Sequence, residues 1–300
     1  MKKKLISLLL SLIVILSFSI SSIYADTNNK GKVIYLSLNR TSLENLLEIP
    51  IIKEKTSNSG YVALMTTKGD GSNTDQKSFA SIGSGVRANV LDEDYVKFET
   101  LNENEKTQFE AATGVKSWAI GNIKINRNIN QNTDNGGYGA TLGMLGTTLN
   151  KNNLKVALLG NSDIKKNDDL KKIRNLALVC MDENGRVQSG NVDNINKKDD
   201  TMPFGISTDY DKLKSETKKY YENNDAIFVE LGDTYRLDQY KGFLNEHTYS
   251  KMKKTIHNNI SKYLESVFNM VGDNDVVYIA SSFPSKLAYK NKERLSPIIK

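Results

Sequence analysis

The chain has 300 residues, of which 38% are hydrophobic and 25% are charged, and its formal net charge is +6. This composition is typical of a folded globular protein that is long enough for one large α/β domain or two smaller ones. The basic residues form no focused stripe, so the charge pattern does not indicate nucleic-acid binding. The one cysteine, Cys180, excludes an internal disulfide and lies in an apolar run, so a hydrophobic core must supply the stability.

The first 25 residues have the order of a secretory signal peptide. Lys2, Lys3 and Lys4 precede an apolar run over residues 5–20, and small and polar residues lead to Ala25. We predict cleavage after Ala25, so that residues 26–300 form a domain that is secreted or held at the outer face of the cytoplasmic membrane. The alternative is an uncleaved membrane anchor, because about 20 apolar residues can span a bilayer. The three lysines carry half of the +6 charge, which leaves +3 on the mature chain.

Short apolar runs predict the strands of a buried sheet. Their hydrophobicity is continuous rather than alternating, which indicates strands that are covered on both faces, as in a parallel sheet. The predicted strands span residues 33–38, 61–65, 154–159, 176–181, 226–231 and 276–280. Residues 294–300 look like the start of one more strand, which suggests that the sequence stops before the domain is complete.

Helices are predicted between these strands, over residues 43–47, 138–149, 209–221 and 246–270. The last is the clearest, because apolar residues recur every three or four positions from Tyr249 to Met270, and Gly272 then ends the helix. The pair Asn184-Gly185 predicts a hairpin turn after the run at 176–181. Polar segments at 161–172 and 191–207 are predicted to be surface loops. The alternation of strands and helices indicates a layered α/β fold.

A polar turn follows the predicted strand at 61–65 and leads into a helix. Thr74 stands in this turn, with Ser72 and Ser78 nearby, and Arg87 follows the helix. In α/β enzymes a hydroxyl at such a turn lies at the carboxyl edge of the sheet beside a helix N-terminus, which suits an anion or a nucleophile. The alternative is that Thr74 only caps the helix. Arg87 could likewise bind an anion or cap a helix end.

The same segment carries a resemblance to a known family. Asn73-Thr-Asp75 precedes Ile82-Gly-Ser-Gly-Val-Arg87, and this order resembles the Asn-Ser-Glu and Ile-Gly-Ala-Gly-Arg elements of cofactor-independent phosphoglycerate mutases. These mutases belong to the alkaline-phosphatase-like superfamily, together with phosphatases and sulfatases. The resemblance covers most of residues 32–300 and is closest to exported bacterial members. It implies a three-layer α/β/α sandwich with a mainly parallel sheet, Thr74 as nucleophile and Arg87 near the anion.

The metal-binding motifs of that superfamily are incomplete in this chain. Asn39 replaces the usual Asp after the first strand, and Asp233 and Asp238 are present without the His of the Gly-His pair. Ser281-Ser282 stands where many members carry Asp-His. Two-metal phosphoryl transfer draws on Asp and His together, but the only histidines, His247 and His257, fall in or beside the predicted long helix, away from the strand ends.

Asn39, Asp233 and Asp238 could therefore hold one divalent cation rather than two. Oxygen ligands suit magnesium or calcium, and the resemblance adds manganese and zinc. The function expected from these departures is that of an exported alkaline-phosphatase-like domain that has lost its dinuclear metal site. Such a domain would bind or scaffold an envelope component or a phosphorylated small molecule.

Two other functions remain open from the sequence. The first is a metal-dependent hydrolase or transferase of phosphate or sulfate esters, with Thr74 as nucleophile. The second is a surface protein that binds sugars or teichoic acid, which would need an exposed aromatic cleft. Tyrosines that could line such a cleft are Tyr220, Tyr221, Tyr235 and Tyr240.

Overall fold

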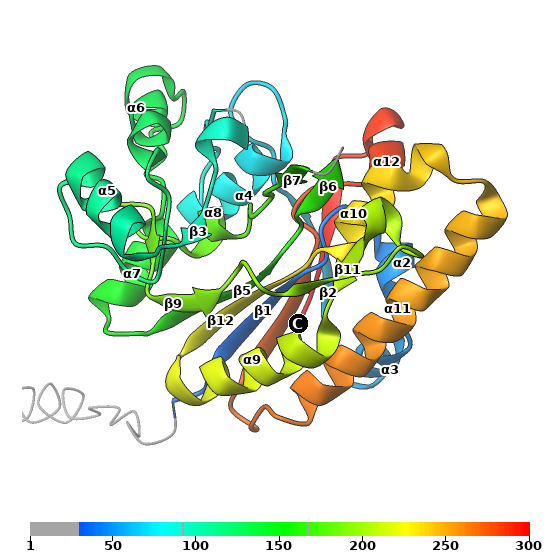
Figure 1. The fold of residues 1–300 in the computed structure, drawn as a ribbon. Helices are drawn as coiled ribbons and strands as arrows, with labels where there is room; N and C mark the ends of the chain where they lie inside the picture. The colour runs from blue at the N-terminus through cyan, green and yellow to red at the C-terminus, as the bar shows by residue number, and fades with distance from the viewer. Residues whose placement is uncertain (1–29, 92, 167–168) are drawn as a thin grey trace, which may run out of the picture. The chain divides into compact units, whose positions relative to one another are not determined.

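A seven-stranded sheet forms the centre of the protein (Figure 1). The computed structural model describes residues 30–91, 93–166 and 169–300, so the predicted signal peptide lies outside the described residues. The strand order is β2 (Val62–Thr66), β14 (Leu295–Ile299), β13 (Val276–Ala280), β1 (Val33–Ser37), β12 (Ala226–Leu231), β5 (Val156–Asn161) and β9 (Ser189–Asn191). β14 runs opposite to the other six strands, which all point the same way. The predicted α/β fold with a mainly parallel sheet is confirmed.

The two faces of the sheet carry separate hydrophobic cores. In the register of the central strands, Tyr35, Phe228 and Leu158 lie side by side and pack into one core. The residues one position further along each of these strands face the opposite side of the sheet and pack into the other core. These strands lack polar alternation because both of their faces are covered, as expected for parallel strands.

Helices cover both faces, which gives three layers. The first core is closed by α4 (Asp75–Ser84), α6 (Ile125–Asn135), α7 (Met144–Lys151) and α8 (Ala177–Cys180), with α5 (Glu103–Thr113) beside them. The second core is closed by α2 (Leu43–Leu47), α3 (Pro50–Asn58), α9 (Tyr210–Asn223), α10 (Asp233–Tyr240) and α11 (Glu246–Phe268). The short helix α12 (Lys286–Lys290) follows β13.

The longest of these helices matches its prediction closely. Asn245 caps the N-terminus of α11, its side chain accepting a hydrogen bond from the Thr248 amide at 2.8 Å. The predicted apolar stripe packs against the sheet, with Ile256, Ile260 and Val267 buried. None of the helices among the described residues is long and apolar enough to cross a membrane.

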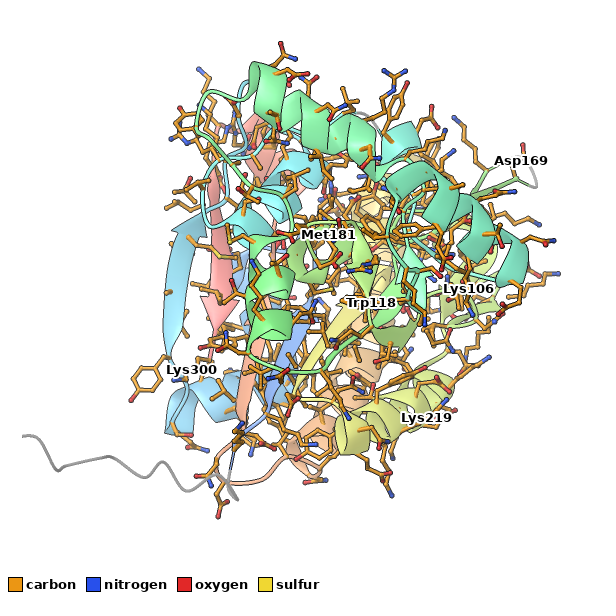
Figure 2. All side chains as sticks on the ribbon, turned by 90° about the vertical axis from the view of Figure 1, so that its left-hand side faces the viewer. Lys106, Trp118, Asp169, Met181, Lys219 and Lys300 are labelled. Carbon is orange, nitrogen blue, oxygen red and sulfur yellow. The ribbon has the colours of Figure 1, made fainter. Side chains whose placement is uncertain are left out.

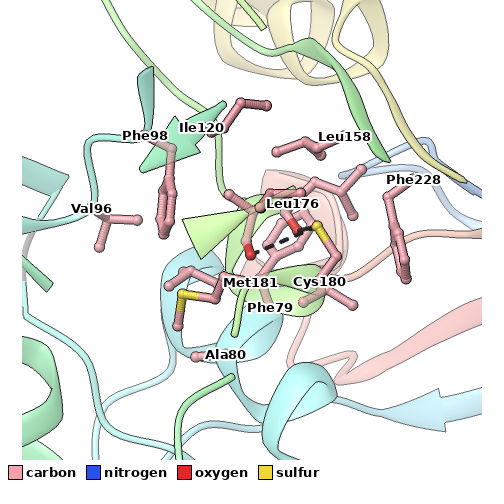
Figure 3. Packing of buried hydrophobic residues seen from close by; sticks show 14 of the residues in the cluster. Phe79, Ala80, Val96, Phe98, Ile120, Leu158, Leu176, Cys180, Met181 and Phe228 are labelled. Carbon is pink, nitrogen blue, oxygen red and sulfur yellow. Dashed lines mark hydrogen bonds between the residues drawn. The ribbon is translucent and has the colours of Figure 1, made fainter. Parts of the chain in front are cut away.

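The run at 176–181 is a helix, not the predicted strand. Its central residues form α8, which lies in the first core, and Figure 3 shows Cys180 and Met181 surrounded by Phe79, Leu158 and Phe228. A short run in which every residue is apolar shows no hydrophobic periodicity, so its sequence alone does not distinguish a helix from a strand. Cys180 is buried as expected, and burial raises the pKa of its thiol.

The Asn184-Gly185 turn forms, but it does not close the predicted hairpin. Gly185 has a φ of +72°, and the turn joins α8 to the short strand β8 (Arg186–Val187). This strand pairs with β4 (Ile120–Gly121), and β4 also pairs with β3 (Glu99–Thr100). Trp118, which is labelled in Figure 2, lies just before β4. The guanidinium carbon of Arg186 lies 4.0 Å from the centroid of the Trp118 ring.

Three further predictions need correction. The strand predicted at 61–65 forms as β2, but it is the exposed edge of the sheet rather than a buried strand. The helix predicted at 138–149 begins only at Met144, because Gly143 at its N-cap has a left-handed φ of +73°. The predicted loops at 161–172 and 191–207 contain two ribbons, β6 (Ile164–Lys166) with β7 (Asp169–Lys171) and β10 (Asn196–Lys198) with β11 (Ile206–Thr208).

Candidate functional site

Buried polar residues follow three strands of the sheet, and of these Asn39 and Asp233 were predicted from the sequence whereas Asp163 was not. Asn39 follows β1, Asp163 follows β5 and Asp233 follows β12, and all three side chains are buried. Because these strands are parallel, their carboxyl ends share the edge at which α/β sheets commonly bind ligands. This edge is therefore the candidate site.

Asn39, Arg40, Asp75 and Asp238 form a first set of contacts, the Arg40 network. The guanidinium of Arg40 forms an ion pair with Asp75, with the Nε at 3.1 Å from Oδ1, and donates to Asp238 Oδ2 at 3.2 Å. Asn39 Nδ2 donates to Asp75 Oδ1 at 2.8 Å. One cation thus bridges two carboxylates that come from α4 and α10.

The surroundings of Arg40 hold it in place. Its backbone has a φ of +60°, a left-handed conformation that is costly for a side chain of this size. The guanidinium carbon lies 5.0 Å from the ring centroid of Phe283 and 5.6 Å from that of Tyr235. Burial by itself lowers the pKa of Arg40, but Asp75 and Asp238 together raise it above its ordinary value. Arg40 is therefore a fixed positive charge.

Both polar atoms of the Asn39 side chain form hydrogen bonds within the protein. Its Oδ1 accepts from the Phe283 amide at 2.9 Å, while its Nδ2 donates to Asp75. Its backbone carbonyl accepts from the Thr234 hydroxyl, also at 2.9 Å. The carbonyl oxygen through which Asn39 was predicted to bind a metal already holds the loop after β13.

Asp163, Arg174, Asp193, Asp233 and Arg236 form a second set, the Arg236 network. Arg236 is completely buried and binds Asp233 Oδ1 through Nε at 3.1 Å and Nη2 at 2.8 Å. It also donates to the Asp163 carbonyl at 3.0 Å and to the Thr208 hydroxyl at 2.7 Å. Asp233 is thus held by the third residue after it, one turn along α10.

Arg174 completes this network and is also buried. Its Nη2 donates to Asp163 Oδ2 at 3.0 Å, and its Nη1 lies 2.7 Å from Asp193 Oδ1. Burial raises the pKa of Asp163, although Arg174 and the Ile173 amide oppose that rise. Two guanidinium groups in this network face three carboxylates, and every one of these side chains except Asp193 is buried.

Glu230 is a buried carboxyl group in the sheet itself. It lies on β12, and its Oε1 accepts from the Ser162 hydroxyl at 2.6 Å. Burial raises its pKa to about 7, while the Ser162 hydrogen bond acts in the opposite direction. Sequence reasoning missed this residue because it falls inside an apolar strand.

The donor set along this edge does not fit a pair of divalent metal ions. Asp233 binds Arg236 whereas Asp238 binds Arg40, so the two aspartates of α10 do not converge on one point. In the part of the chain that the structure describes, no group of three or more His, Cys, Asp or Glu side chains could hold a metal ion. Guanidinium groups supply the positive charge that these carboxylates need.

The two histidines differ in their surroundings. His247 is exposed on α11. His257 is buried and lines a small cavity of about 80 Å³ with Arg40 and Asp238, closer to the strand ends than the sequence predicted. Burial and Lys253 lower the pKa of His257 to about 4, so its imidazole is neutral at pH 7.

Thr74 caps helix α4. Its hydroxyl oxygen accepts from the Lys77 amide at 3.3 Å, and its backbone is extended, as is usual at an N-cap. The predicted capping role is confirmed. Thr74 also lines a polar cleft of about 670 Å³ together with Ser72, Lys77 and Asn89, so its role as a nucleophile stays a prediction.

The cap predicts a measurable loss of stability. Replacing Thr74 with alanine should lower the free energy of unfolding by about 1 kcal/mol, because one amide of the first turn loses its acceptor. Thr74→Ser keeps the acceptor and should stay within a few tenths of a kcal/mol of the parent. Urea denaturation of both variants measures the difference. Equal stability of the alanine and serine variants would show that the cap contributes nothing.

Arg87 lies away from these networks, on the surface beside the loop before α7. Its guanidinium donates to the Tyr138 hydroxyl at 2.8 Å and lies 5.2 Å from the centroid of that ring. Among the residues that the structure describes, Arg87 forms no hydrogen bond with Thr74. A role of Arg87 in anion binding stays a prediction.

Comparisons with known proteins found similarity only at the level of solved structures. No family model matches the chain, and no curated protein matches its sequence. The lipoteichoic acid synthase LtaP of Listeria monocytogenes aligns at 11% identity over 90% of this chain and 65% of that one, with a TM-score of 0.45. The alkaline phosphatase of the Antarctic bacterium TAB5 aligns at 10% identity over 85% and 79%, with a TM-score of 0.40.

A third match is the cofactor-independent phosphoglycerate mutase of Thermoplasma acidophilum, at 11% identity over 89% of both chains, with a TM-score of 0.36. A phosphatase and a phosphoglycerate mutase are among the kinds of protein that the sequence resemblance named. The TM-scores and identities of these matches are low, so they assign no function to this chain.

Proposed function

We propose that this chain is an exported alkaline-phosphatase-like domain that binds a component of the cell envelope and does not use a metal pair to cleave esters. One observation carries the proposal. Each aspartate of the two networks forms an ion pair with a buried or largely buried arginine, namely Asp75 and Asp238 with Arg40, Asp163 and Asp193 with Arg174, and Asp233 with Arg236.

The chemistry of arginine supports this conclusion. A guanidinium neutralises a carboxylate as a metal ion would, but it cannot coordinate a water or substrate oxygen as a Lewis acid. It also stays protonated at neutral pH and cannot serve as a general acid or base there. A metal that bound Asp233 would lie close to the buried guanidinium of Arg236, whose like charge opposes its binding. The two networks therefore hold the side chains at this edge of the sheet in fixed positions.

The competing function is an ester hydrolase with Thr74 as nucleophile, and the polar cleft beside Thr74 is the observation that favours it. The two functions differ in what they require of a metal. The hydrolase needs at least one cation near Asp233 or Asp238, whereas the binding domain needs none.

Elemental analysis of residues 26–300, purified without chelator, tests the proposal. We expect no stoichiometric magnesium, calcium, manganese or zinc, and no change after dialysis against each metal. One equivalent of a metal that is lost in Asp238→Asn would overturn the proposal, most directly if phosphatase or sulfatase activity accompanied it and disappeared in Thr74→Ala. Circular dichroism of each sample confirms that the protein measured is folded.

A further inference from the structure

A cavity of about 970 Å³ opens beside the Arg236 network, and we name it the aromatic cleft. Asp163, at the end of β5, lies in its wall, so the cleft is at the carboxyl end of the parallel strands. Its other walls come from β6, β10 and the two 3₁₀ turns η2 (Pro203–Gly205) and η3 (Lys241–Phe243). The volume is at the upper end of the range found for ligand pockets.

Three aromatic rings line this cleft, Phe204 from η2 and Tyr240 and Phe243 from the end of α10 and η3. The centroids of Phe204 and Tyr240 are 5.0 Å apart, and those of Tyr240 and Phe243 are 5.1 Å apart. Phe243 is 78% exposed, which is unusual for so large an apolar side chain. Adjoining aromatic rings of which one is exposed offer a surface on which the flat apolar face of a ligand can stack.

One of these rings belongs to a residue with an unfavourable backbone conformation. Phe204 has a φ of +61°, in the left-handed region that is unfavourable for residues with a Cβ. The edge-on contact with Tyr240 fixes the ring in this position. Strained residues of this kind persist where the surrounding structure requires them and are concentrated at ligand sites.

The charges along the cleft favour an anion. Four lysines line it, Lys165, Lys166, Lys197 and Lys198. Of the three lining aspartates, Asp163 and Asp193 are bound by Arg174, and Asp200 lies 3.2 Å from Lys198. The four lysines outnumber the three aspartates, two of which share Arg174, so the lining presents a net positive charge to a ligand.

We propose that the aromatic cleft binds an anionic saccharide. The apolar C–H face of a sugar ring would stack on Tyr240 and Phe243, whose ring faces carry partial negative charge. The lysines would bind carboxylate or phosphate groups of the same sugar chain. Of the four tyrosines predicted to line a sugar cleft, only Tyr240 does so here, because Tyr220 and Tyr221 bond to Gly190 and Asp275 and Tyr235 is buried.

This inference names the ligand class for the proposed binding role and rests on that role. Isothermal titration of the folded domain with tetragalacturonate, phosphorylated maltotetraose and neutral maltotetraose tests it. We expect at least one anionic sugar to bind more tightly than the neutral one, with an affinity that falls as salt is added. The two anionic probes distinguish a carboxylated from a phosphorylated ligand.

Two variants locate the site. Phe243→Ser should weaken the binding of the anionic sugar about tenfold, as expected for an exposed aromatic contact residue. Lys166→Glu combined with Lys197→Glu should remove the preference for the anionic sugar while leaving neutral maltotetraose unaffected. The matched controls are Tyr61→Ser, another exposed ring that does not line the cleft, and Lys262→Glu on α11, and neither should change binding.

Three results would overturn the inference. They are no binding of either anionic sugar at millimolar concentration, equal binding by the parent and by Phe243→Ser, and equal affinity for an oligothymidylate of the same charge. Absence of sugar binding in a metal-free protein would leave the proposed binding domain standing with another ligand. Stoichiometric metal would instead overturn the proposed function whatever the sugars do.

Discussion

Replacing Arg236 with methionine should lower the free energy of unfolding by roughly 3–5 kcal/mol, the cost of leaving one partner of a buried ion pair without the other. Arg236 is fully buried, and its guanidinium binds Asp233, the Thr208 hydroxyl and the Asp163 carbonyl. Methionine fills a similar space but brings no charge, so the Asp233 carboxylate remains in a dry site. Guanidinium chloride denaturation at pH 7 measures the loss.

A second substitution separates the charge from the packing. Adding Asp233→Asn to Arg236→Met removes the uncompensated carboxylate, so the double variant should recover part of the lost stability. Lys262→Met on the exposed face of α11 is the control and should stay within about 0.5 kcal/mol of the parent. If Arg236→Met cost less than about 1 kcal/mol, the arginine could not be the partner that holds Asp233 in place.

Glu230→Gln should change how stability depends on pH. The pKa of Glu230 is raised from 4.5 to about 7 in the folded protein, chiefly by burial. Below pH 4.5 the folded and unfolded states both hold the proton, so the group has no effect. Between pH 4.5 and 7 the folded state retains a proton that the unfolded state releases, so stability falls as the pH rises, by a total of roughly 3 kcal/mol.

Glutamine carries no titratable proton, so this dependence should disappear in the variant. Relative to the parent, Glu230→Gln should gain roughly 3 kcal/mol between pH 4 and pH 8, whatever constant offset its new amide introduces. Ser162→Ala is the matched control. The serine hydroxyl lowers the pKa of Glu230, so its removal should raise that pKa further and extend the decline in stability to higher pH. Parallel stability curves for the parent and Glu230→Gln would show that Glu230 ionises normally.

The parts of the fold that follow from the sequence are those with a clear hydrophobic period or a fully buried run. The central strands β1, β5, β12 and β13 and the helix α11 were predicted close to their observed bounds. The run at 176–181 was predicted wrongly because its apolar residues carry no period, and only the tertiary structure decides that α8 forms there. The strand β2 was placed correctly, but its position at the sheet edge depends on pairing with distant residues.

The site was predicted only in part, for a physical reason. The superfamily resemblance pointed to Asn39, Asp233 and Asp238, and the ends of the parallel strands bring Asn39 and Asp233 to one edge. Their arginine partners were missed, since a single arginine in a polar segment looks the same whether it is solvated or buried. One usable signal existed, the spacing of Asp233 and Arg236 by three residues on a helix, which places opposite charges side by side.

The position of β14 in the sheet has a consequence for how the chain folds. Within the sheet, β2 pairs only with β14, through the register from Val62 with Ile299 to Thr66 with Leu295. These partners lie more than two hundred residues apart in sequence, so their pairing closes a very long loop and raises the contact order of the domain. While the protein is being synthesised, β2 has no strand to join until residues 295–299 have emerged. This edge strand is thus made early and can be added only late, and its apolar side chains stay unpaired in the interval.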